Sequence, residues 1–484
     1  MKMPRGLRLF CRVRKPTRML SGVTVVAVMA RPHPCPHGRC VYCPGGVTMG
    51  TPQSYVPESP AVQRALRHGF HPYDQVRARL LQYVAVGHRP SKVELIVMGG
   101  TFPAMPLDYQ EWFVAQALEA MNRFPEPRRP GWVYLEDAQL RNETASVRCV
   151  GLTLETRPDW AKERHVDVFL YLGATRVELG VQTVYDDVLA RVRRGHTVRD
   201  SIEATRVLKD AGYKVTYHMM LGLPGVDPDA DLEAFRRVYE DPDFRPDSVK
   251  IYPTVVVPGT ELYGWWERGR YSPYDEETLV ELVARIKTLT PPWVRIIRVQ
   301  RDIPSHWIAA GPRSTNLREL VWHYMWRRGL RCRCIRCREV GRYALWTGEA
   351  PRVEDARLVR RDYEASGGLE VFLSFEDAAR DVLYGFLRLR LPSERAHRWE
   401  VGPRTAIVRE LHVYGPATPV GERGEWWQHR GLGSLLLSEA ERVASEDLDA
   451  TRLLVISGVG AREYYFSKGY SRLKGSFYVY KDLD

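Results

Sequence analysis

The sequence of 484 residues lacks a long hydrophobic run, an internal repeat and a low-complexity tract. No apolar stretch approaches the roughly 20 residues that a membrane-spanning helix requires. Hydrophobic residues make up 44% and charged residues 27% of the chain, which excludes a disordered or collagen-like protein. We therefore expect a globular protein with a cytoplasmic location, no membrane contact and no segment that points to an obligate protein partner.

Acidic residues are missing from the start of the chain, where Glu58 is the first. Nine Lys or Arg precede it, so the remainder carries only three of the twelve net positive charges. A concentrated basic arm is typical of proteins that contact a phosphate backbone. A targeting segment is the alternative for residues 1–20, but the apolar run after it leads into a cysteine-rich loop without a cleavage site. The pattern favours a nucleic-acid-binding arm.

Cysteines are few, and their spacing favours metal centres in a reducing cytosol over a disulfide framework: eight occur, as two triplets plus isolated Cys11 and Cys149. The first triplet, in HPCPHGRCVYCPGG, comprises Cys35, Cys40 and Cys43. Three close thiolates without an evident fourth suit a 4Fe-4S cluster that leaves one iron open for a cofactor. A structural zinc loop completed by His33 or His37 is the alternative.

The second triplet, Cys332, Cys334 and Cys337, is spaced to bind one tetrahedral zinc ion, with His306 or His323 as the fourth ligand. A metal-free turn is the alternative. Six arginines surround these thiols, and aromatic residues precede them, so the segment also has the charge and stacking surfaces of an RNA contact. A solvated basic face would have the same composition. The residues are Trp322, Tyr324, Trp326, Arg327, Arg328, Arg331, Arg333, Arg336 and Arg338.

Between the triplets, six stretches rich in Val, Ile and Leu alternate with helical segments. This pattern predicts a parallel sheet covered by helices, a barrel or partial barrel with its chemistry at the carboxyl ends of the strands. Candidate cofactor-binding residues follow those strands: Gly99, Gly100, Thr101, Glu155 and Gln182, with His218 at the fifth strand end. Lys250 lies within the sixth strand and is a candidate catalytic residue.

From residue 340 onward the sequence alternates strands with turns and then has QHRGLGS at the start of a helix. Backbone amides and the helix dipole at such a loop suit a pyrophosphate. The loop resembles the coenzyme A loop of the GNAT acetyltransferases, and the later YYFSKGY run strengthens that resemblance. It implies that the strand 410–413 contacts the acetyl and pantetheine arm and that Tyr465 lies near the thioester. Tyr464, Tyr465 and Tyr470 could equally be core aromatics.

A radical S-adenosylmethionine barrel joined to a GNAT domain resembles the catalytic subunit of Elongator over nearly the whole chain. Segments that carry the resemblance include KVELIVMGGTF, ELGVQTVYDDV, VRELHVYG, QHRGLG and VISGVGAREYYFSKGY. It implies an α/β fold with a basic tRNA-binding arm (1–20), a partial (β/α)6 radical domain (21–300), a zinc-binding linker (301–339) and an α+β GNAT domain (340–484). Implied coenzyme contacts are Lys92, Glu410, Leu411, His412, Val413, Gln428, Gly431, Leu432, Gly433, Ser434 and Tyr465.

The resemblance also implies a reaction, the formation of 5-carboxymethyluridine at the tRNA wobble position with acetyl-coenzyme A as the carbon donor. The cluster, reduced by an electron donor, would cleave S-adenosylmethionine, and the resulting radical would take hydrogen from the acetyl methyl group. The carbon radical would add to uracil in the anticodon stem-loop, and hydrolysis would free the carboxymethyl group. A protein lysine acetyltransferase with a structural iron-sulfur barrel and a radical RNA methylase are the alternatives.

Overall fold

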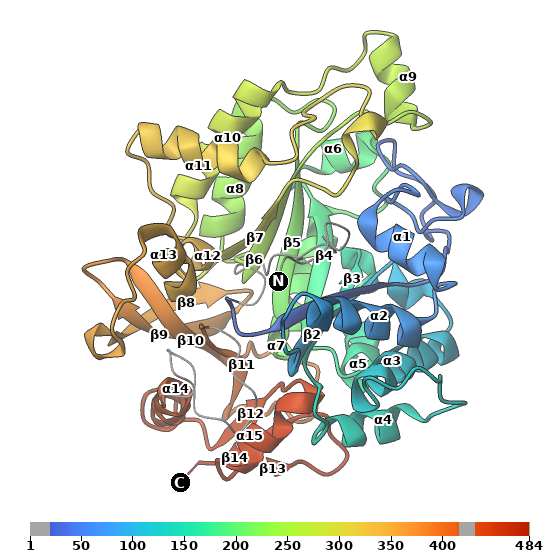
Figure 1. Cartoon of the computed structure of the whole chain (residues 1–484). Helices are drawn as coiled ribbons and strands as arrows, with labels where there is room; N and C mark the ends of the chain where they lie inside the picture. Colours follow the sequence, from blue (N-terminus) through green and yellow to red (C-terminus); the bar gives the residue numbers. More distant parts are fainter. Residues whose placement is uncertain (1–19, 416–430, 484) are drawn as a thin grey trace, which may run out of the picture.

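The computed structural model describes residues 20–415 and 431–483, and Figure 1 shows its two β-sheets with their helices. The first sheet is parallel and takes its strands in chain order, as the predicted alternation of strands and helices requires. Its two outermost strands are not paired with each other in that order, so the sheet is a half-barrel. The strands are β1 (Thr24–Met29), β2 (Lys92–Met98), β3 (Arg148–Thr156), β4 (Arg176–Gln182), β5 (Lys214–Leu221), β6 (Ser248–Pro253) and β7 (Arg295–Val299).

The seventh strand was not among the six that the sequence predicted. β7 pairs in parallel with β6, but its sequence RIIRV is short and contains two arginines. Arg295 enters the protein interior because its guanidinium forms an ion pair with buried Glu339. A search for apolar runs misses such a strand, since its buried charge is compensated only by a residue distant in sequence.

Helices cover one face of the half-barrel and leave the other face open to cavities. On β2 the odd-numbered residues Val93, Leu95 and Val97 are buried in the core, whereas the even-numbered residues are half-buried on what we call the inner face. The helices are α1 (Pro60–Arg67), α2 (Pro72–Ala85), α3 (Leu107–Asn122), α4 (Leu135–Asn142), α5 (Glu163–Tyr171), α6 (Asp186–Arg191), α7 (Val198–Asp210), α8 (Pro228–Glu240), α9 (Glu261–Glu267) and α10 (Glu276–Leu289).

The second sheet is mixed, as expected for an α+β domain. Its order is β13-β14-β12-β11-β10-β9-β8, and only β11 and β12 are parallel neighbours. Because parallel neighbours need a crossover, the chain between them contains α14 (Leu432–Arg442), which packs on β9, β10 and β11. The strands are β8 (Arg357–Ala365), β9 (Gly368–Asp377), β10 (Val382–Leu391), β11 (Thr405–Val413), β12 (Arg452–Val455), β13 (Ser471–Arg472) and β14 (Val479–Asp482), with α15 (Arg462–Phe466) before β13.

Three helices connect the sheets: α11 (Leu317–Arg327), α12 (Ile335–Arg338) and α13 (Val340–Thr347). α12 contacts both β7 and β10, so this linker packs against each sheet. The sheets also share one packed apolar cluster, to which β11 contributes Ile407 and β12 contributes Leu454. Gly458 and Gly460 allow the backbone after β12 to pack against β3: a Cβ at Gly458 would lie 2.3 Å from Val150 O.

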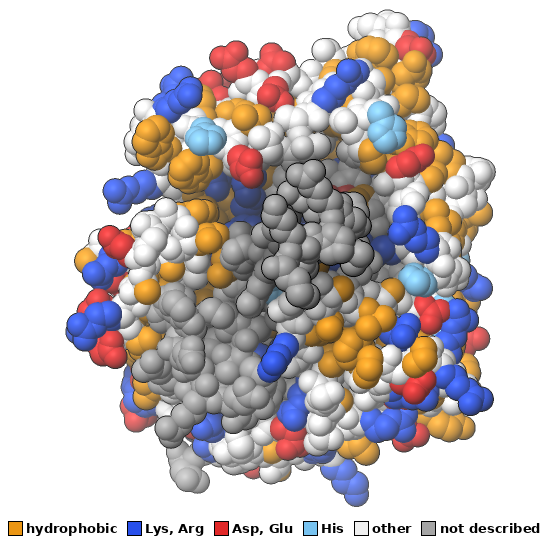
Figure 2. Space-filling model, in the orientation of Figure 1, with side chains coloured by type: hydrophobic (Ala, Val, Ile, Leu, Met, Phe, Trp, Pro, Cys, Tyr) orange, Lys and Arg blue, Asp and Glu red, His pale blue; other side chains and the backbone are white. Residues whose placement is uncertain are grey.

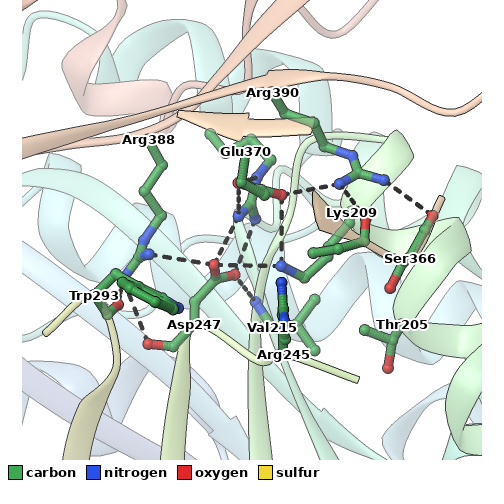
Figure 3. Close-up of polar contacts among 12 residues, drawn as sticks. Thr205, Lys209, Val215, Arg245, Asp247, Trp293, Ser366, Glu370, Arg388 and Arg390 are labelled. Atoms are coloured by element: carbon green, nitrogen blue, oxygen red, sulfur yellow. Dashed lines mark hydrogen bonds and ion pairs between the residues drawn. The ribbon is translucent and has the colours of Figure 1, made fainter. Parts of the chain in front are cut away.

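A buried network of charges crosses the junction between the sheets (Figure 3). Arg409 on β11 contacts Asp247, just before β6, at 2.6 Å and Glu370 on β9 at 2.7 Å. Lys209 on α7 lies 3.4 Å from Glu370, and Arg390 on β10 contacts Glu370 at 3.0 Å. These side chains are at most 2% exposed, so each depends on an opposite charge from another element.

Some predicted features lie outside the described residues. The basic arm up to residue 19, including Cys11, and Gln428 of the coenzyme loop belong to the ranges 1–19 and 416–430. In the remaining chain, no helix is both long enough and apolar enough to cross a membrane.

Candidate active site

Three thiols face one cavity at the carboxyl ends of the barrel strands. Cys35, Cys40 and Cys43 lie in the loop after β1, which turns through hydrogen bonds from Gly38 N to Cys35 O (3.0 Å) and from Cys43 N to Cys40 O (3.1 Å). All three line a cavity of about 130 Å³. Cys40 and Cys43 are buried, and Cys35 is partly exposed. The loop thus directs its thiols toward the end of the barrel where the predicted site residues lie.

The spacing of these sulfur atoms differs from that of the second triplet. Cys332, Cys334 and Cys337 have sulfur atoms within 4.8 Å of one another, and no such tight group in the described chain contains the first triplet. A zinc ion with Zn–S bonds of about 2.3 Å holds its sulfur ligands about 3.8 Å apart. A cubane cluster instead binds each thiolate to a different iron. The first triplet therefore fits a cluster better than a single zinc ion.

The two histidines considered for a zinc loop differ in their contacts. His37 Nε2 lies 3.2 Å from Cys40 Sγ, whereas His33 Nδ1 contacts Pro34 O at 2.8 Å. His37 also lines the cavity. The contact of His37 with Cys40 holds that thiol in place, but one histidine beside one thiol does not make a four-ligand zinc site.

Arg194 is buried beside the thiols. Its Nη1 is 3.8 Å from Cys40 Sγ, and its Nε and Nη2 donate to Gly180 O at 3.2 and 2.8 Å. Burial alone would lower the pKa of Arg194, but neighbouring Tyr42 and Cys40 raise it. The hydrogen bond with Cys40 lowers the pKa of Cys43 to about 6. A permanent cation here stabilises negative charge on the sulfur ligands.

A network of five ionisable side chains also lines this cavity. Lys250 Nζ contacts Glu155 at 3.4 Å and forms a closer ion pair with Glu178. His218 Nε2 lies 2.7 Å from Glu178 Oε2, and Tyr55 Oη donates to Glu155 Oε2 at 3.2 Å. Burial opposes the charge of Lys250, but Glu178 raises its pKa above the ordinary value. The strand ends thus present a charged lysine held between two carboxylates.

The other predicted cofactor residues take different positions. Gly100 and Thr101 line the cavity, and Gly100 has φ 80°, a conformation that favours glycine. Gly99 instead packs on β1, where a Cβ would lie 3.1 Å from that of Ala30. Gln182 has φ 72°, and its buried Oε1 has no hydrogen-bond partner in the described chain. It lines the cavity beside Glu155.

A second cavity, of about 210 Å³, lies between the two sheets. Lys92 of β2 lines it together with the predicted strand 410–413 and Tyr465. Burial lowers the pKa of Lys92 to about 8 and raises that of Tyr465 above its usual value. Arg176 and Lys214 also line it, which gives the cavity several cations. The predicted coenzyme contacts from the two domains therefore meet in one place.

The described part of the coenzyme loop adjoins this cavity without lining it. Gly431 caps α14 with φ 87°, a conformation that favours glycine. Gly433, between Leu432 and Ser434, sits against the strand: a Cβ there would lie 3.6 Å from Val413 Cγ2 and 3.3 Å from Tyr464 Oη. The start of α14 is thus adjacent to β11, as a coenzyme that spans both would require.

The second thiol triplet does not include the predicted histidine. In the described chain, the tight group of metal-ligand atoms at Cys332, Cys334 and Cys337 contains no histidine or carboxylate. His306 lies in the short 3₁₀ helix Ser305–Trp307, where its ring contacts Trp307. The assignment of His306 or His323 as the fourth zinc ligand stays a prediction.

Next to this triplet, α11 presents an exposed aromatic surface. Trp322 is 45% and Trp326 is 70% exposed, and neither packs into the core. Arg327 and Arg328 are also exposed, and Arg328 lies over the Tyr324 ring at 4.5 Å. Figure 2 shows hydrophobic and basic side chains side by side over this part of the surface.

Two catalytic-site residues were not assigned from the sequence. Glu178 and Arg194 line the thiol cavity; Glu178 begins the segment ELGVQTVYDDV that carries the family resemblance, but no role was assigned to either residue. Glu178 lies four residues before Gln182, on the same face of β4, so strand alternation was the available signal. Nothing local marks Arg194, whose contact with Cys40 joins loops that are distant in sequence.

Comparison with known proteins identifies the family. Residues 33–238 match the Radical SAM superfamily and residues 246–327 the Radical SAM C-terminal domain. The chain is 50% identical over 465 residues to a tRNA uridine(34) acetyltransferase of Methanocaldococcus jannaschii, covering 95% of this chain and 85% of that protein. It is 46% identical to human Elongator complex protein 3, covering 96% and 85%. The chain belongs to the family of the tRNA uridine(34) acetyltransferases and Elongator complex protein 3.

A solved structure supports the same assignment at the level of the fold. The archaeal Methanocaldococcus infernus Elp3 with residues 1–46 deleted matches with a TM-score of 0.84 and 46% identity. The match covers 96% of this chain and all of that chain. The radical-domain sheet and the C-terminal sheet therefore have the same arrangement in both proteins. The fold class expected from the sequence is confirmed.

Proposed function

We propose that this protein modifies the wobble uridine of tRNA and forms 5-carboxymethyluridine from acetyl-coenzyme A. Its family supplies the substrate class, since the relatives are tRNA uridine(34) acetyltransferases and Elongator subunits. The observation that carries the finer proposal is that Lys92 of the barrel and the 410–413 strand of the C-terminal domain line one cavity. A coenzyme held there would contact both domains, so the acetyltransferase domain would bind the acetyl donor that the radical domain uses.

The thiol cavity fits a 4Fe-4S cluster with S-adenosylmethionine. Three thiols leave one iron open, and buried Gln182 Oε1 and Thr156 Oγ1, which have no partner in the described chain, suit a polar ligand. When bound, the cluster and S-adenosylmethionine supply a radical that removes a hydrogen atom. The Lys250–Glu178 ion pair fixes both side chains at the cavity wall, and His218 can hold a proton at Nε2, the ring nitrogen that faces Glu178.

The interdomain cavity fits the acetyl end of the coenzyme. Lys92 and Arg176 supply cations, and Tyr465 supplies a hydroxyl with a raised pKa, which stays protonated and can donate to a thioester oxygen. The second thiol triplet fits a zinc ion with a fourth ligand that the described residues do not provide. An electron donor in a reducing, cytoplasmic setting would complete the system.

Isotope transfer tests this function. We expect acetyl-coenzyme A with a trideuterated methyl group to place deuterium in 5′-deoxyadenosine and to give tRNA a carboxymethyl group at the wobble uridine. The assay uses anaerobically reconstituted enzyme, S-adenosylmethionine, a reductant and tRNA, with mass spectrometry of both products and solvent exchange controlled.

The other two functions give different labels. A lysine acetyltransferase would retain all three deuteriums on a protein lysine, and a radical methylase would take its carbon from S-adenosylmethionine. Carboxymethyluridine formed without deuterium in 5′-deoxyadenosine would overturn the proposed route.

A further inference from the structure

The two cavities lie at opposite ends of the same inner face. Arg176 on β4 lines the interdomain cavity, and Glu178, two residues later, lines the thiol cavity. On β2, Glu94 lines the interdomain cavity and Met98 the thiol cavity. Because a parallel strand rises about 3.3 Å per residue, the steps are about 7 Å on β4 and about 13 Å on β2. One layer of inner-face side chains separates the cavities.

That layer is incompletely packed. The strand register places Ala27 beside Ile96 and Ile96 beside Thr153, and we call these three residues the connecting layer. Ala27 and Ile96 are only half-buried, and neighbouring Val25 on the same face is 38% exposed. In a closed barrel such positions are filled by interlocking side chains. Here Ala27, Ile96 and Val25 leave a partly exposed apolar surface between the two ends, which we call the track.

A polar atom without a partner lies on this track. Thr153 is 1% exposed, and its Oγ1 has no hydrogen-bond partner in the described chain. It stands on β3 between Gly151, which lines the interdomain cavity, and Glu155, which lines the thiol cavity. An unsatisfied buried hydroxyl costs stability unless a ligand completes it, so Thr153 suits an amide or a thioester carbonyl.

Ion pairs border the track on the β4 side. Arg176 forms one with Glu94 and lies 3.7 Å from Glu410 of β11, while Lys250 is paired with Glu178. These pairs hold the charged groups to one side and leave Ala27 and Ile96 as the apolar side of the route. A narrow chain with alternating methylene and amide groups matches this lining.

We propose that the acyl-pantetheine arm of the coenzyme lies across the connecting layer, so that its acetyl group enters the thiol cavity from beneath. This inference rests on the proposed function and specifies how its two halves meet. The coenzyme is anchored at Lys92 and β11, its arm contacts Ala27, Ile96 and Thr153, and its methyl group reaches the carboxyl ends of the strands. The uridine then approaches the thiol cavity from the other side.

A cysteine series along β2 tests this route in the reconstituted holoenzyme. Bromoacetyl-coenzyme A is the probe, since a thiol within reach displaces bromide and gains a mass that peptide mapping detects. Ile96→Cys and Met98→Cys place thiols on the layer and in the thiol cavity, and Ala378→Cys, exposed in the turn after β9, is the control. Wild-type protein gives the background of the native cysteines, and the cluster absorbance must be unchanged.

We expect both β2 variants to be alkylated at least about tenfold faster than Ala378→Cys, because a bound reagent has a high effective concentration. Excess acetyl-coenzyme A should suppress the labelling. Adding Ala27→Trp to Met98→Cys should remove the advantage, because the larger side chain fills the connecting layer.

Labelling of Met98→Cys no faster than of the control, or unchanged labelling when Ala27→Trp fills the layer, would overturn the proposed route. Ile96→Cys gives the same decision if one variant fails to fold. The labelling needs only coenzyme binding, so it remains informative if wild-type enzyme makes no carboxymethyluridine. Conversely, product formation without labelling would retain the proposed function and reject the route.

Discussion

Cys40 is the residue at which the metal assignment is tested most directly, because its buried thiol contacts His37 and Arg194 as well as the cavity. We expect Cys40→Ala to abolish reductive cleavage of S-adenosylmethionine, since two thiolates cannot hold a cluster with a single open iron. The measurement is 5′-deoxyadenosine after anaerobic reconstitution.

Cys149→Ala is the matched control, because that buried thiol lies on β3 away from the cavity and should leave cleavage intact. Affinity for acetyl-coenzyme A should change by less than about twofold in both variants, since its cavity is at the other end of the strands. A Cys40→Ala protein that still forms 5′-deoxyadenosine would refute the ligand assignment.

Lys92 gives the coenzyme cavity a measurable pH dependence. Burial lowers its pKa to about 8, so the charged form that attracts an anion predominates below this value and is lost as the pH rises through it. We expect the affinity for acetyl-coenzyme A to fall about tenfold between pH 7 and pH 9, in step with the protonated fraction.

The charge-retaining variant separates this cause from others. In Lys92→Arg the affinity should be nearly independent of pH over the same range, because arginine stays protonated. Titration calorimetry of both proteins measures the effect. An equal decline in Lys92→Arg would assign the pH dependence to another group.

Among the elements, α11 carries two exposed tryptophans, Trp322 and Trp326, that lie outside the hydrophobic core. We expect Trp326→Ala to weaken tRNA binding, because an aromatic ring that stacks on a base contributes about 1–3 kcal/mol. Trp399→Ala is the matched control, since Trp399 is 64% exposed and Trp326 is 70% exposed. Binding is measured by titration with tRNA at fixed salt.

The two tryptophan variants should differ by about fivefold or more in affinity. Equal affinities would show that α11 is only a solvated surface. A second variant, Arg327→Gln, should also reduce the salt dependence of binding by up to about one unit of slope if that arginine meets a phosphate.

At the scale of the whole molecule, the buried charges between the sheets decide whether the two domains unfold together. Arg409 contacts Asp247 and Glu370, so Arg409→Met leaves two carboxylates buried without it. We expect a loss of about 3–5 kcal/mol in the free energy of unfolding. Calorimetry should then resolve separate transitions for the two sheets.

Arg404→Met is the control, because it breaks the exposed pair with Asp449. It should change the free energy of unfolding by at most about 1 kcal/mol. A similar small effect for Arg409→Met would mean that apolar packing alone joins the domains.

Much of the fold could be predicted because its signals are local. The apolar strands of the barrel, the glycines after β2 and the cysteine loop each depend on neighbours in the chain, and they lie where the sequence places them. β7 was missed because its Arg295 is paired with Glu339, which is distant in sequence. The fourth ligand of the second thiol triplet stays a prediction, because motif spacing alone does not select it.

The sequence by itself determined the family, and it predicted the candidate thiol ligands and two sets of candidate cofactor contacts, since motif spacing within one loop or strand limits which atoms can meet. Only the tertiary structure decided that these sets face opposite ends of one sheet, that Glu178 and Arg194 complete the thiol cavity, and that Arg409 joins the domains. Contacts of this kind depend on strand register and on the packing of distant segments, where a shift of one residue reverses the face to which a side chain points.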